Sequence, residues 1–297
     1  MTGTPRDWVL IAAADSGYYT LLLDMIESVR AQRGLEDAPI AVFDLGLDTL
    51  QRAALMREGI QLLAPHWHLG LDGRGLPTHH LGLLVRPFLR DYLPGYRRYL
   101  WLDADAWIQD GAAIERLLAG ARATGLAVVH EREPSYRFQA WLQAWTLKHF
   151  ILGCGAWSGI RLMARPHLNA GIFCLEADAP HWESWQAHLA RAVSRTGRIA
   201  PYDQFALNAA VHGDGLPAAL LDPIDNWICD RGPPLWDAAA RRFCRPRPPF
   251  TPLAILHLAG PAKTARYALA TREGRRVEAA LTYRWVRTNL HPAAGVA

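Results

Sequence analysis

The first 64 residues alternate between short apolar runs and longer segments whose apolar residues recur every three or four positions. Continuous apolar runs are typical of buried strands, and the longer spacing is typical of one face of a helix. A repeated strand–helix order indicates a parallel sheet covered by helices on both faces. The pattern predicts strands at 8–14, 39–43 and 60–64, and helices at 21–32 and 48–58.

The same alternation continues to residue 257, without an internal repeat. A glycine-rich loop at 70–78 lacks the Gly-Lys-Ser/Thr ending of a phosphate-binding loop. One α/β domain with a C-terminal extension, rather than two separate cores, is therefore expected. The remaining predicted elements are helices at 81–92, 114–122, 182–193 and 203–211, and strands at 99–102, 126–130, 169–175 and 253–257.

Composition narrows the class of protein. Hydrophobic residues make up 51% of the 297 residues and charged residues 20%, which excludes a wholly disordered chain. No apolar stretch reaches the ~20 residues of a membrane-spanning helix. Asp7 and Asp15 interrupt the start of the chain, where a secretory signal would be basic and then apolar. We therefore expect a cytoplasmic protein.

The charge and the cysteines exclude further classes. A formal net charge of +4 does not predict a nucleic-acid partner, and it fits a positive cleft for an anionic small molecule equally well. The four cysteines are widely spaced and form no C-x-x-C pair, so we expect reduced thiols and neither a disulfide framework nor a zinc site.

Two carboxylates follow directly after the predicted strand at 99–102. Asp103 and Asp105 are two residues apart, and in an extended segment such residues project to the same side. Two like charges so close are costly unless a cation compensates them. Mg²⁺ and Mn²⁺ prefer oxygen ligands of this kind, which they share with substrate phosphates. An isolated D-x-D pair also occurs in ordinary acidic turns, so the surrounding sequence decides its meaning.

That surrounding sequence, RRYLWLDADAWIQD at 97–110, closely resembles the "YLDxD" strand end of GT-A glycosyltransferases. Four further blocks, in the right order, are similar to motifs of the family-8-like retaining enzymes, which include bacterial galactosyltransferases and glycogenin-type proteins. These blocks are AADSGY (13–18), LNAGIF (168–173), YDQFALN (202–208) and HLAGPAK (257–263).

The resemblance covers about residues 8–264. It implies a GT-A domain at 1–264, with a Rossmann-like mixed sheet flanked by helices, and leaves 265–297 as a basic C-terminal helical extension. The sequence departs from the family pattern at two places near the expected donor-binding site. Thr264-Ala265 stand where the family has Pro-Trp, and Val85 stands where it has Tyr.

Carried over position by position, the resemblance implies a metal ion, Mn²⁺ or Mg²⁺, held by Asp103, Asp105 and His257. It also implies that Gly260 and Lys263 embrace the diphosphate of the donor, with Lys263 as a point charge on the leaving group. The other implied contacts are to the uracil by Asp15 and Tyr18, to the donor by Arg86, to the sugar hydroxyls by Asn169 and Asp203, and to the reacting anomeric face by Gln204.

The implied activity is metal-dependent transfer of a hexose from a UDP-sugar to an acceptor, a saccharide, a lipid-linked glycan or another molecule, with retention of anomeric configuration. A two-step retaining reaction needs a carboxylate nucleophile near the anomeric carbon. Gln204 is a poor nucleophile, so front-side displacement is the preferred mechanism, with Asp203 as the fallback nucleophile.

Two other classes stay open. A nucleotidyltransferase shares the sheet and the carboxylate pair, but we would expect a loop rich in Gly and Arg or Lys after the first strand, and Asp15-Ser16-Gly17 begins no such loop. A catalytically silent carbohydrate-binding module is the other alternative, and the intact Asp103, Asp105, His257 and Lys263 argue against it.

Three segments have two interpretations each. Six aromatic residues between 136 and 157 either line an acceptor groove or fill the core. Asn226-Trp227 resembles a family strand only loosely, and we favour core packing there. A predicted basic helix at 272–290 places Val277, Leu281 and Trp285 near one face; it either contacts anionic membrane lipid or packs on its own domain, and we favour the second.

Overall fold

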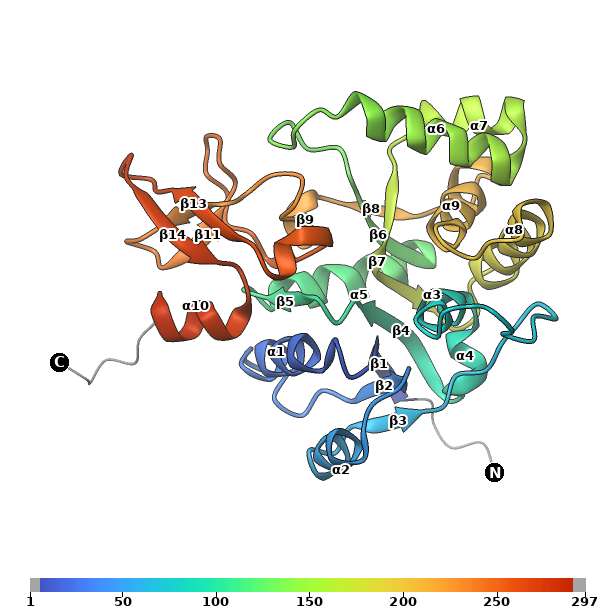
Figure 1. The fold of residues 1–297 in the computed structure, drawn as a ribbon, viewed down its shortest axis with the longest axis horizontal. Helices are drawn as coiled ribbons and strands as arrows, with labels where there is room; N and C mark the ends of the chain where they lie inside the picture. Colours follow the sequence, from blue (N-terminus) through green and yellow to red (C-terminus); the bar gives the residue numbers. More distant parts are fainter. Residues whose placement is uncertain (1–5, 291–297) are drawn as a thin grey trace.

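Seven strands form the central sheet of the chain, whose residues 6–290 the computed structural model describes (Figure 1). Their order across the sheet is β3-β2-β1-β4-β7-β6-β8. The six strands that the apolar runs predicted here are confirmed, and β8 is a short addition. The strands are β1 (Arg6–Ala14), β2 (Ile40–Asp44), β3 (Gln61–Leu63), β4 (Tyr96–Leu102), β6 (Leu126–His130), β7 (Leu168–Glu176) and β8 (Ala219–Leu221).

The sheet is mixed. Strands β1, β2, β3 and β4 are parallel, but β7 runs antiparallel to both of its neighbours, β4 and β6. The parallel sheet expected from element order is therefore wrong for β7, whereas the mixed sheet implied by the resemblance is confirmed. The chain between β6 and β7 returns to the sheet edge that it left, since His130 pairs with Leu168. The first residues of β7 consequently lie at the edge where β4 ends.

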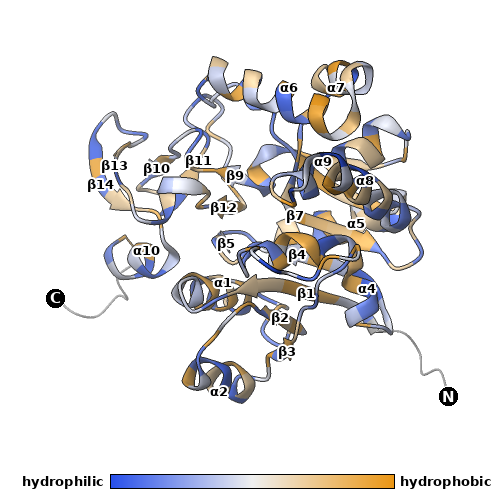
Figure 2. Cartoon of the chain, turned by 45° about the vertical axis from the view of Figure 1, so that its right-hand side comes forward, coloured by the Kyte–Doolittle hydropathy of each residue, from blue (hydrophilic) through white to orange (hydrophobic). Residues whose placement is uncertain are grey.

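Side-chain alternation divides the core into two layers. In β1, Val9 and Ile11 pack into one hydrophobic cluster, and Leu10 and Ala12 pack into the other, because successive side chains of a strand point to opposite faces. The strands in the middle of the sheet carry mainly hydrophobic residues (Figure 2). Helices α1 (Tyr19–Arg30), α2 (Thr49–Arg57) and α5 (Ala112–Thr124) cover the second face.

The first face is covered by helices that come from the middle of the chain. They are α3 (His80–Leu84), α4 (Leu89–Tyr92), α6 (Ala140–Cys154), α7 (Ala156–Met163), α8 (His181–Thr196) and α9 (Tyr202–Asn208). None of the helices within residues 6–290 combines the length and the apolar character that crossing a bilayer requires.

Two predicted helices are interrupted. The helix expected at 81–92 breaks into α3, a 3₁₀ turn (Arg86–Phe88) and α4. Pro87 explains the break, because proline lacks an N–H and disfavours helical geometry in the residue before it. The helix expected at 203–211 ends as α9 at Asn208 and continues as a π-helical turn (Ala209–Gly213).

A second, three-stranded sheet lies beside the first and has the order β5-β12-β9. Its strands are β5 (Ala106–Ile108), β9 (Trp227–Ile228) and β12 (Ile255–His257). Within it His257 pairs with Ala106 in antiparallel register. Since β5 begins just after Asp105, this pairing brings a residue from late in the chain to the end of β4.

The C-terminal segment differs from the predicted basic helix. Residues 266–280 form a hairpin of β13 (Arg266–Ala270) and β14 (Arg276–Ala280), and only α10 (Tyr283–Asn289) is helical. Gly274, at φ +79°, allows the turn of the hairpin. The helix expected over 272–282 is therefore wrong, and the part of the prediction at 291–297 lies outside the described residues.

These C-terminal elements pack on their own protein. Leu269, Leu281 and Val286 are buried in one cluster with Trp227 and Phe243. The expectation that this segment packs on its own domain agrees with that burial, whereas the division at 264/265 stays a prediction. The remaining short strands are β10 (Leu235–Asp237) and β11 (Arg242–Cys244).

The aromatic tract at 136–157 follows neither of its two interpretations as a whole. Phe150 is buried in the core, and the hydroxyl of Tyr136 accepts a hydrogen bond from the Ile228 backbone N–H at 2.8 Å. Phe138 and Trp157, in contrast, are each 82% exposed.

Candidate functional site

Three side chains that can ligate a metal converge where β4 ends. A carboxylate oxygen of Asp103, one of Asp105 and a ring nitrogen of His257 all lie within 4.8 Å of one another. The Nε2 atom of His257 is 3.3 Å from Oδ1 of Asp105 and 3.8 Å from Oδ2 of Asp103. Over residues 6–290, no other group of three or more His, Cys, Asp or Glu side chains gathers in this way.

Backbone geometry keeps space free in this cluster. The N–H of Asp103 donates to the carbonyl of Gly171 in β7 at 2.9 Å. A Cβ on Gly171 would lie 2.7 Å from Oδ2 of Asp103 and 2.7 Å from Cε1 of His257, closer than real Cβ contacts. Glycine at 171 is therefore required by the close approach of the Asp103, His257 and Asn169 side chains.

Opposite charges compensate the buried carboxylates. The Nζ atom of Lys263 lies 2.8 Å from Oδ2 of Asp105. Burial alone would raise the pKa of Asp105, but His257 and Lys263 hold it well below its usual range. Burial alone would lower the pKa of His257, but Asp105 and Asp103 raise it above its usual value. The two aspartates therefore favour the protonated form of His257, whose positive charge adds to that of Lys263.

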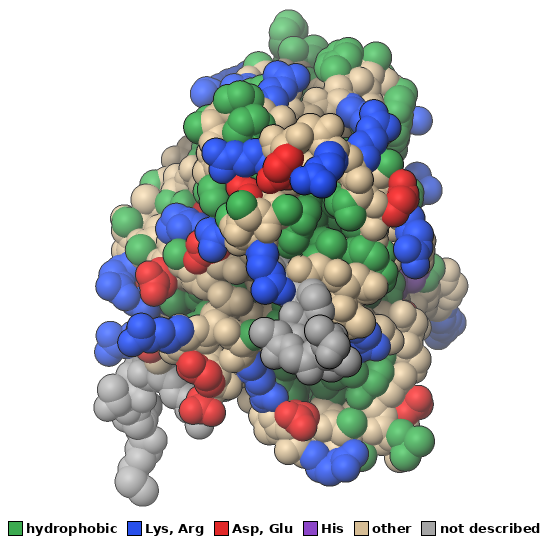
Figure 3. Space-filling model, turned by 90° about the vertical axis from the view of Figure 1, so that its left-hand side faces the viewer, with side chains coloured by type: hydrophobic (Ala, Val, Ile, Leu, Met, Phe, Trp, Pro, Cys, Tyr) green, Lys and Arg blue, Asp and Glu red, His purple; other side chains and the backbone are tan. Residues whose placement is uncertain are grey.

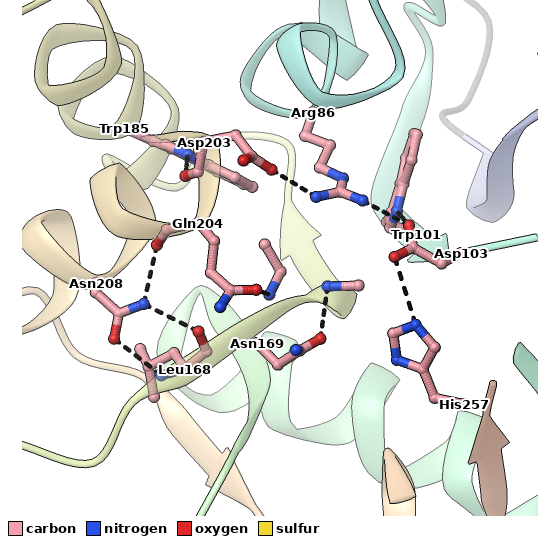
Figure 4. A network of polar contacts seen from close by, with 12 residues as sticks. Arg86, Trp101, Asp103, Leu168, Asn169, Trp185, Asp203, Gln204, Asn208 and His257 are labelled. Atoms are coloured by element: carbon pink, nitrogen blue, oxygen red, sulfur yellow. Dashed lines mark hydrogen bonds and ion pairs between the residues drawn. The ribbon is translucent and has the colours of Figure 1, made fainter. Parts of the chain in front are cut away.

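Arg86 joins the end of β4 to the start of α9 (Figure 4). One terminal nitrogen of its guanidinium lies 2.6 Å from Oδ1 of Asp103, and the other lies 2.5 Å from Oδ2 of Asp203. The arginine side chain is 8% exposed, and the indole of Trp101 donates to the same Asp103 oxygen at 2.7 Å. Arg86 thus fixes two carboxylates, and its implied contact with the donor stays a prediction.

A chain of amides supports the histidine. The Nδ1 atom of His257 is 2.9 Å from Oδ1 of Asn226, whose Nδ2 donates to Oδ1 of Asn169 at 3.0 Å. Asn169 in turn donates from Nδ2 to Oε1 of Glu131 at 2.7 Å, and Arg231 pairs with Glu131 at 2.6 Å. Because an amide oxygen accepts from Nδ1, the Nε2 atom of His257 is the nitrogen left to face the aspartates.

Gln204 lies beside the start of β7 (Figure 4). Its Oε1 accepts from the backbone N–H of Ala170 at 3.1 Å, and its Nε2 is 2.8 Å from Nε2 of His167. Its neighbour Asp203 is buried, with a side chain 3% exposed. The structure therefore brings Gln204 and Asn169 to the same edge as Asp103, Asp105 and His257, whereas Asp203 is paired with Arg86.

The residues expected at the nucleotide also gather near Lys263. Asp15 follows β1, and its Oδ1 accepts from the backbone N–H of Tyr18 at 3.0 Å. The Nζ atom of Lys263 is 5.5 Å from the ring centre of Tyr18. Gly260 begins the 3₁₀ turn (Gly260–Lys263) that carries this lysine, and its φ of +59° is rare for other residues.

The donor set of the cluster fits a divalent metal. Two carboxylates and one imidazole suit Mn²⁺ well and Mg²⁺ less well, because imidazole is a softer ligand than oxygen. Gly171 leaves the room that an ion needs, and Asn226 holds the histidine in the ligating orientation. Asp103, Asp105 and His257 are therefore the residues that would hold a metal here.

Sequence reasoning missed some of the supporting residues. It assigned Asn226 to core packing, but this residue, 2% exposed, hydrogen-bonds both His257 and Asn169. The loose resemblance of residues 225–229 to a family strand was the available signal. Nothing in the local pattern indicated Glu131 or Trp101, because their roles depend on which strands become neighbours.

The strand order with its reversed β7 agrees with the mixed-sheet GT-A fold that the resemblance predicted. No family model matches the chain, and no curated protein matches it.

Solved structures do match the chain. Galactosyltransferase LgtC, in complex with donor and acceptor sugar analogues, is 16% identical, with 97% of each chain covered and a TM-score of 0.53. Mouse xyloside xylosyltransferase 1 is 14% identical over 87% of this chain and 99% of its own, at 0.52. The bifunctional glycosyltransferase WbbM is 13% identical over 88% of this chain and 47% of its own, at 0.51. At these identities the likeness establishes the fold.

The first prediction concerns Gly171. We expect Gly171→Ala to weaken Mn²⁺ binding by roughly 10- to 100-fold, because the new methyl group would displace the side chains of Asp103 and His257, two of the candidate ligands. Isothermal titration calorimetry with Mn²⁺ alone measures this. Gly213→Ala is the control, since a Cβ there meets nothing within 4 Å. Unchanged affinity in the Gly171 variant would show that the cluster does not bind the ion.

The second prediction concerns Arg86. Arg86→Met should lower the free energy of unfolding by about 3–5 kcal/mol, because it leaves the buried Asp203 without its counter-charge. Urea denaturation measures the change. The double variant Arg86→Met/Asp203→Asn should recover part of the loss, since no buried charge then remains at 203. A single variant as stable as the wild type would contradict this view of the ion pair.

Proposed function

We propose that this chain is a metal-dependent glycosyltransferase that transfers a hexose from a UDP-sugar to an acceptor with retention of anomeric configuration. The observation that carries the proposal is the cluster of Asp103, Asp105 and His257, with Lys263 beside it, at the sheet edge where α/β proteins bind ligands. The glycosyltransferase folds that match the chain support it, and LgtC among them holds donor and acceptor sugar analogues.

In this proposal Asp103, Asp105 and His257 bind Mn²⁺ or Mg²⁺. The bound metal supplies positive charge where the leaving diphosphate becomes more negative. Lys263 supplies a second positive charge: it pairs with Asp105 in the free protein and turns to the diphosphate when the donor binds. Gly260 lets the backbone of the same turn approach the phosphates.

The other proposed donor contacts follow the edge of the sheet. Asp15 and Tyr18, after β1, bind the uracil, and the partly exposed ring of Tyr18 offers it a stacking surface. Asn169 binds sugar hydroxyls through its remaining hydrogen-bonding capacity. Arg86 and Asp203 form a buried ion pair with each other. In this proposal they therefore act at the sugar site mainly by fixing the positions of the residues around it.

The proposed chemistry is front-side displacement. The bond between the anomeric carbon and the diphosphate oxygen breaks, the acceptor oxygen bonds to the same face, and its proton passes to the departing diphosphate. Asp203 fits poorly as a covalent nucleophile, because its side chain is 3% exposed and paired with Arg86. Gln204 positions the sugar, and an LgtC variant with an active-site glutamine changed to glutamate is consistent with a glutamine at this place.

We propose that the acceptor is a saccharide or a lipid-linked glycan and that the protein acts in the cytoplasm on a small anionic donor, with no nucleic-acid partner. The mild net charge of +4 is consistent with a small anionic donor and does not call for a nucleic-acid partner.

The third prediction tests the function itself. A panel of sugar nucleotides is incubated with the protein and Mn²⁺, without acceptor, and hydrolysis of each is scored. We expect turnover of one UDP-sugar, complete loss of it in EDTA and in Asp103→Asn, and early-time NMR showing the released sugar with the donor's anomeric configuration. Tight donor binding without turnover would instead favour a silent binding module, and an inverted anomer would overturn retention.

The fourth prediction concerns Lys263. Lys263→Ala should raise the activation barrier by about 2–4 kcal/mol, because a positive charge near the leaving group is lost. The turnover rate should therefore fall by roughly 30- to 1,000-fold. The chain contains a single other lysine, Lys148, whose exposed position on α6 makes Lys148→Ala a matched control in solution. A Lys263 variant within twofold of wild type would show that this side chain serves only to pair with Asp105.

A further inference from the structure

Exposed hydrophobic side chains concentrate on one part of the molecule. Ten large hydrophobic residues are exposed in the part of the chain that the structure describes, and six of them lie between 138 and 160. The six are Phe138, Trp141, Trp145, Leu152, Trp157 and Ile160. They belong to α6, to α7 and to the segment just before α6, which we call the aromatic hairpin (residues 138–163). Scattered exposed apolar residues need no explanation, but a concentration of this kind marks an interaction surface.

Helix α6 has a buried side and an exposed side that also carries large hydrophobic residues. Thr146, His149, Phe150 and Gly153 are buried and form the stripe that packs on the protein. Residues 141, 145, 148 and 152 have the same helical spacing and point outward, and three of them are Trp141, Trp145 and Leu152. A helix that is apolar on all sides is normally buried on all sides. Here Trp145 of the outer stripe contacts the rings of His149 and Phe205, whereas Trp141 is 66% exposed and Leu152 is 44% exposed.

Helix α7 repeats this arrangement. Gly159 and Leu162 are buried, whereas Trp157 is 82% and Ile160 is 53% exposed. A Cβ on Gly159 would lie 2.7 Å from the backbone nitrogen of Ile151, so the two helices pack closely. The hairpin is therefore a firmly packed pair of helices at the outer end of the molecule (Figure 1), and it carries the exposed hydrophobic residues named above.

The charge of this unit has one sign. No Asp or Glu occurs between Glu133 and Glu176, whereas Arg137, Lys148, Arg161 and Arg165 are exposed on or beside the hairpin. The face that carries the C-terminal elements is different, because basic side chains are mixed there with acidic ones (Figure 3). Exposed tryptophan combined with unopposed positive charge is the composition of surfaces that lie in the headgroup region of anionic membranes.

From this composition we propose that the aromatic hairpin docks the protein on an anionic lipid surface. Trp141, Trp157 and Phe138 enter the interfacial region, and Lys148 and Arg161 pair with lipid phosphates. Their exposure distinguishes this surface from a sugar-binding groove, because sugar-stacking rings line concave sites, whereas these rings project outward. The unopposed positive charge also disfavours a second copy of the same face, which would meet like charge.

The inner side of the hairpin gives this docking a position relative to the candidate site. It covers a cavity of about 250 Å³ whose lining includes Phe150, Glu131 and His167. Glu131 and His167 contact Asn169 and Gln204, the proposed sugar-binding residues. Docking would therefore bring the sugar site close to the lipid surface, as an acceptor anchored in lipid requires. This last step rests on the proposed function, whereas lipid binding itself does not.

Vesicle sedimentation tests the proposal without any need for activity. Purified full-length protein is sedimented with vesicles of phosphatidylcholine alone and with vesicles containing phosphatidylglycerol, at low and at high salt. We expect binding to the anionic vesicles that salt weakens. Trp141→Ser/Trp157→Ser and Lys148→Glu/Arg161→Glu should each reduce the partition coefficient by about tenfold or more.

Matched controls separate this surface from general stickiness. Leu50→Ser/Met56→Ser removes two exposed apolar residues of α2, and Arg33→Glu/Arg97→Glu reverses two exposed charges elsewhere; both should bind as the wild type does. Thermal melts confirm that each variant is folded. The proposal is overturned if the hairpin variants bind vesicles as strongly as the wild type does. It is also overturned if the wild type does not bind vesicles and instead forms a dimer that the tryptophan variants abolish. Donor turnover in solution is scored separately, so that failure of docking and failure of the proposed function remain distinguishable.

Discussion

Three aspartate side chains meet at one edge of the central sheet, and the compensation of their charge is the constraint on which the site depends. Asp103, Asp105 and Asp203 are largely removed from water, so each needs a positive partner. Arg86 serves two of them, and Lys263 serves the third. These cations come from a turn after α3 and a turn after β12, so the electrostatics of the site join segments far apart in the sequence. A divalent cation held by Asp103, Asp105 and His257 would add further positive charge at the same place.

The reversed direction of β7 makes this assembly possible. A parallel β7 would place Asn169 and Gly171 at the opposite edge of the sheet, away from the end of β4. Because the chain returns to the edge that it left, the Gly171 carbonyl instead binds the backbone of Asp103, and Asn169 reaches the amide that supports His257. The small sheet completes the site by pairing β12 with β5. One strand direction and one strand pairing thus bring residues 103, 169 and 257 together.

Much of this could be predicted from the sequence, and the limits have physical causes. Buried strands leave continuous apolar runs, and the ordered motifs identified the Asp pair and His257. The direction of β7 left no such trace, because a buried strand has the same run of apolar residues whether it is parallel or antiparallel to its neighbours. The role of Asn226 depends on its two partners, His257 and Asn169, which lie far from it in the sequence. Its local sequence therefore does not distinguish it from an asparagine that is buried without such partners. The hairpin at 266–280 was predicted to be helical because Val277 and Leu281 have the spacing of one helix face, although residues 266–270 and 276–280 in fact pair as strands. Gly274 was the only local sign of the turn between them.

The aromatic hairpin shows the same limit of prediction from sequence. Sequence periodicity detects apolar positions, but it cannot tell which of two stripes on α6 the protein itself will cover. The chain between β6 and β7 has to begin and end at the carboxyl edge of the sheet, so the helices within it lie beside the candidate site. Their inner stripe is then fixed against the residues that support Asn169 and Gln204, and their outer stripe has to face outward. This surface therefore lies next to the candidate site because of where the strands end, and a partner that covers it would also lie close to Asn169 and Gln204.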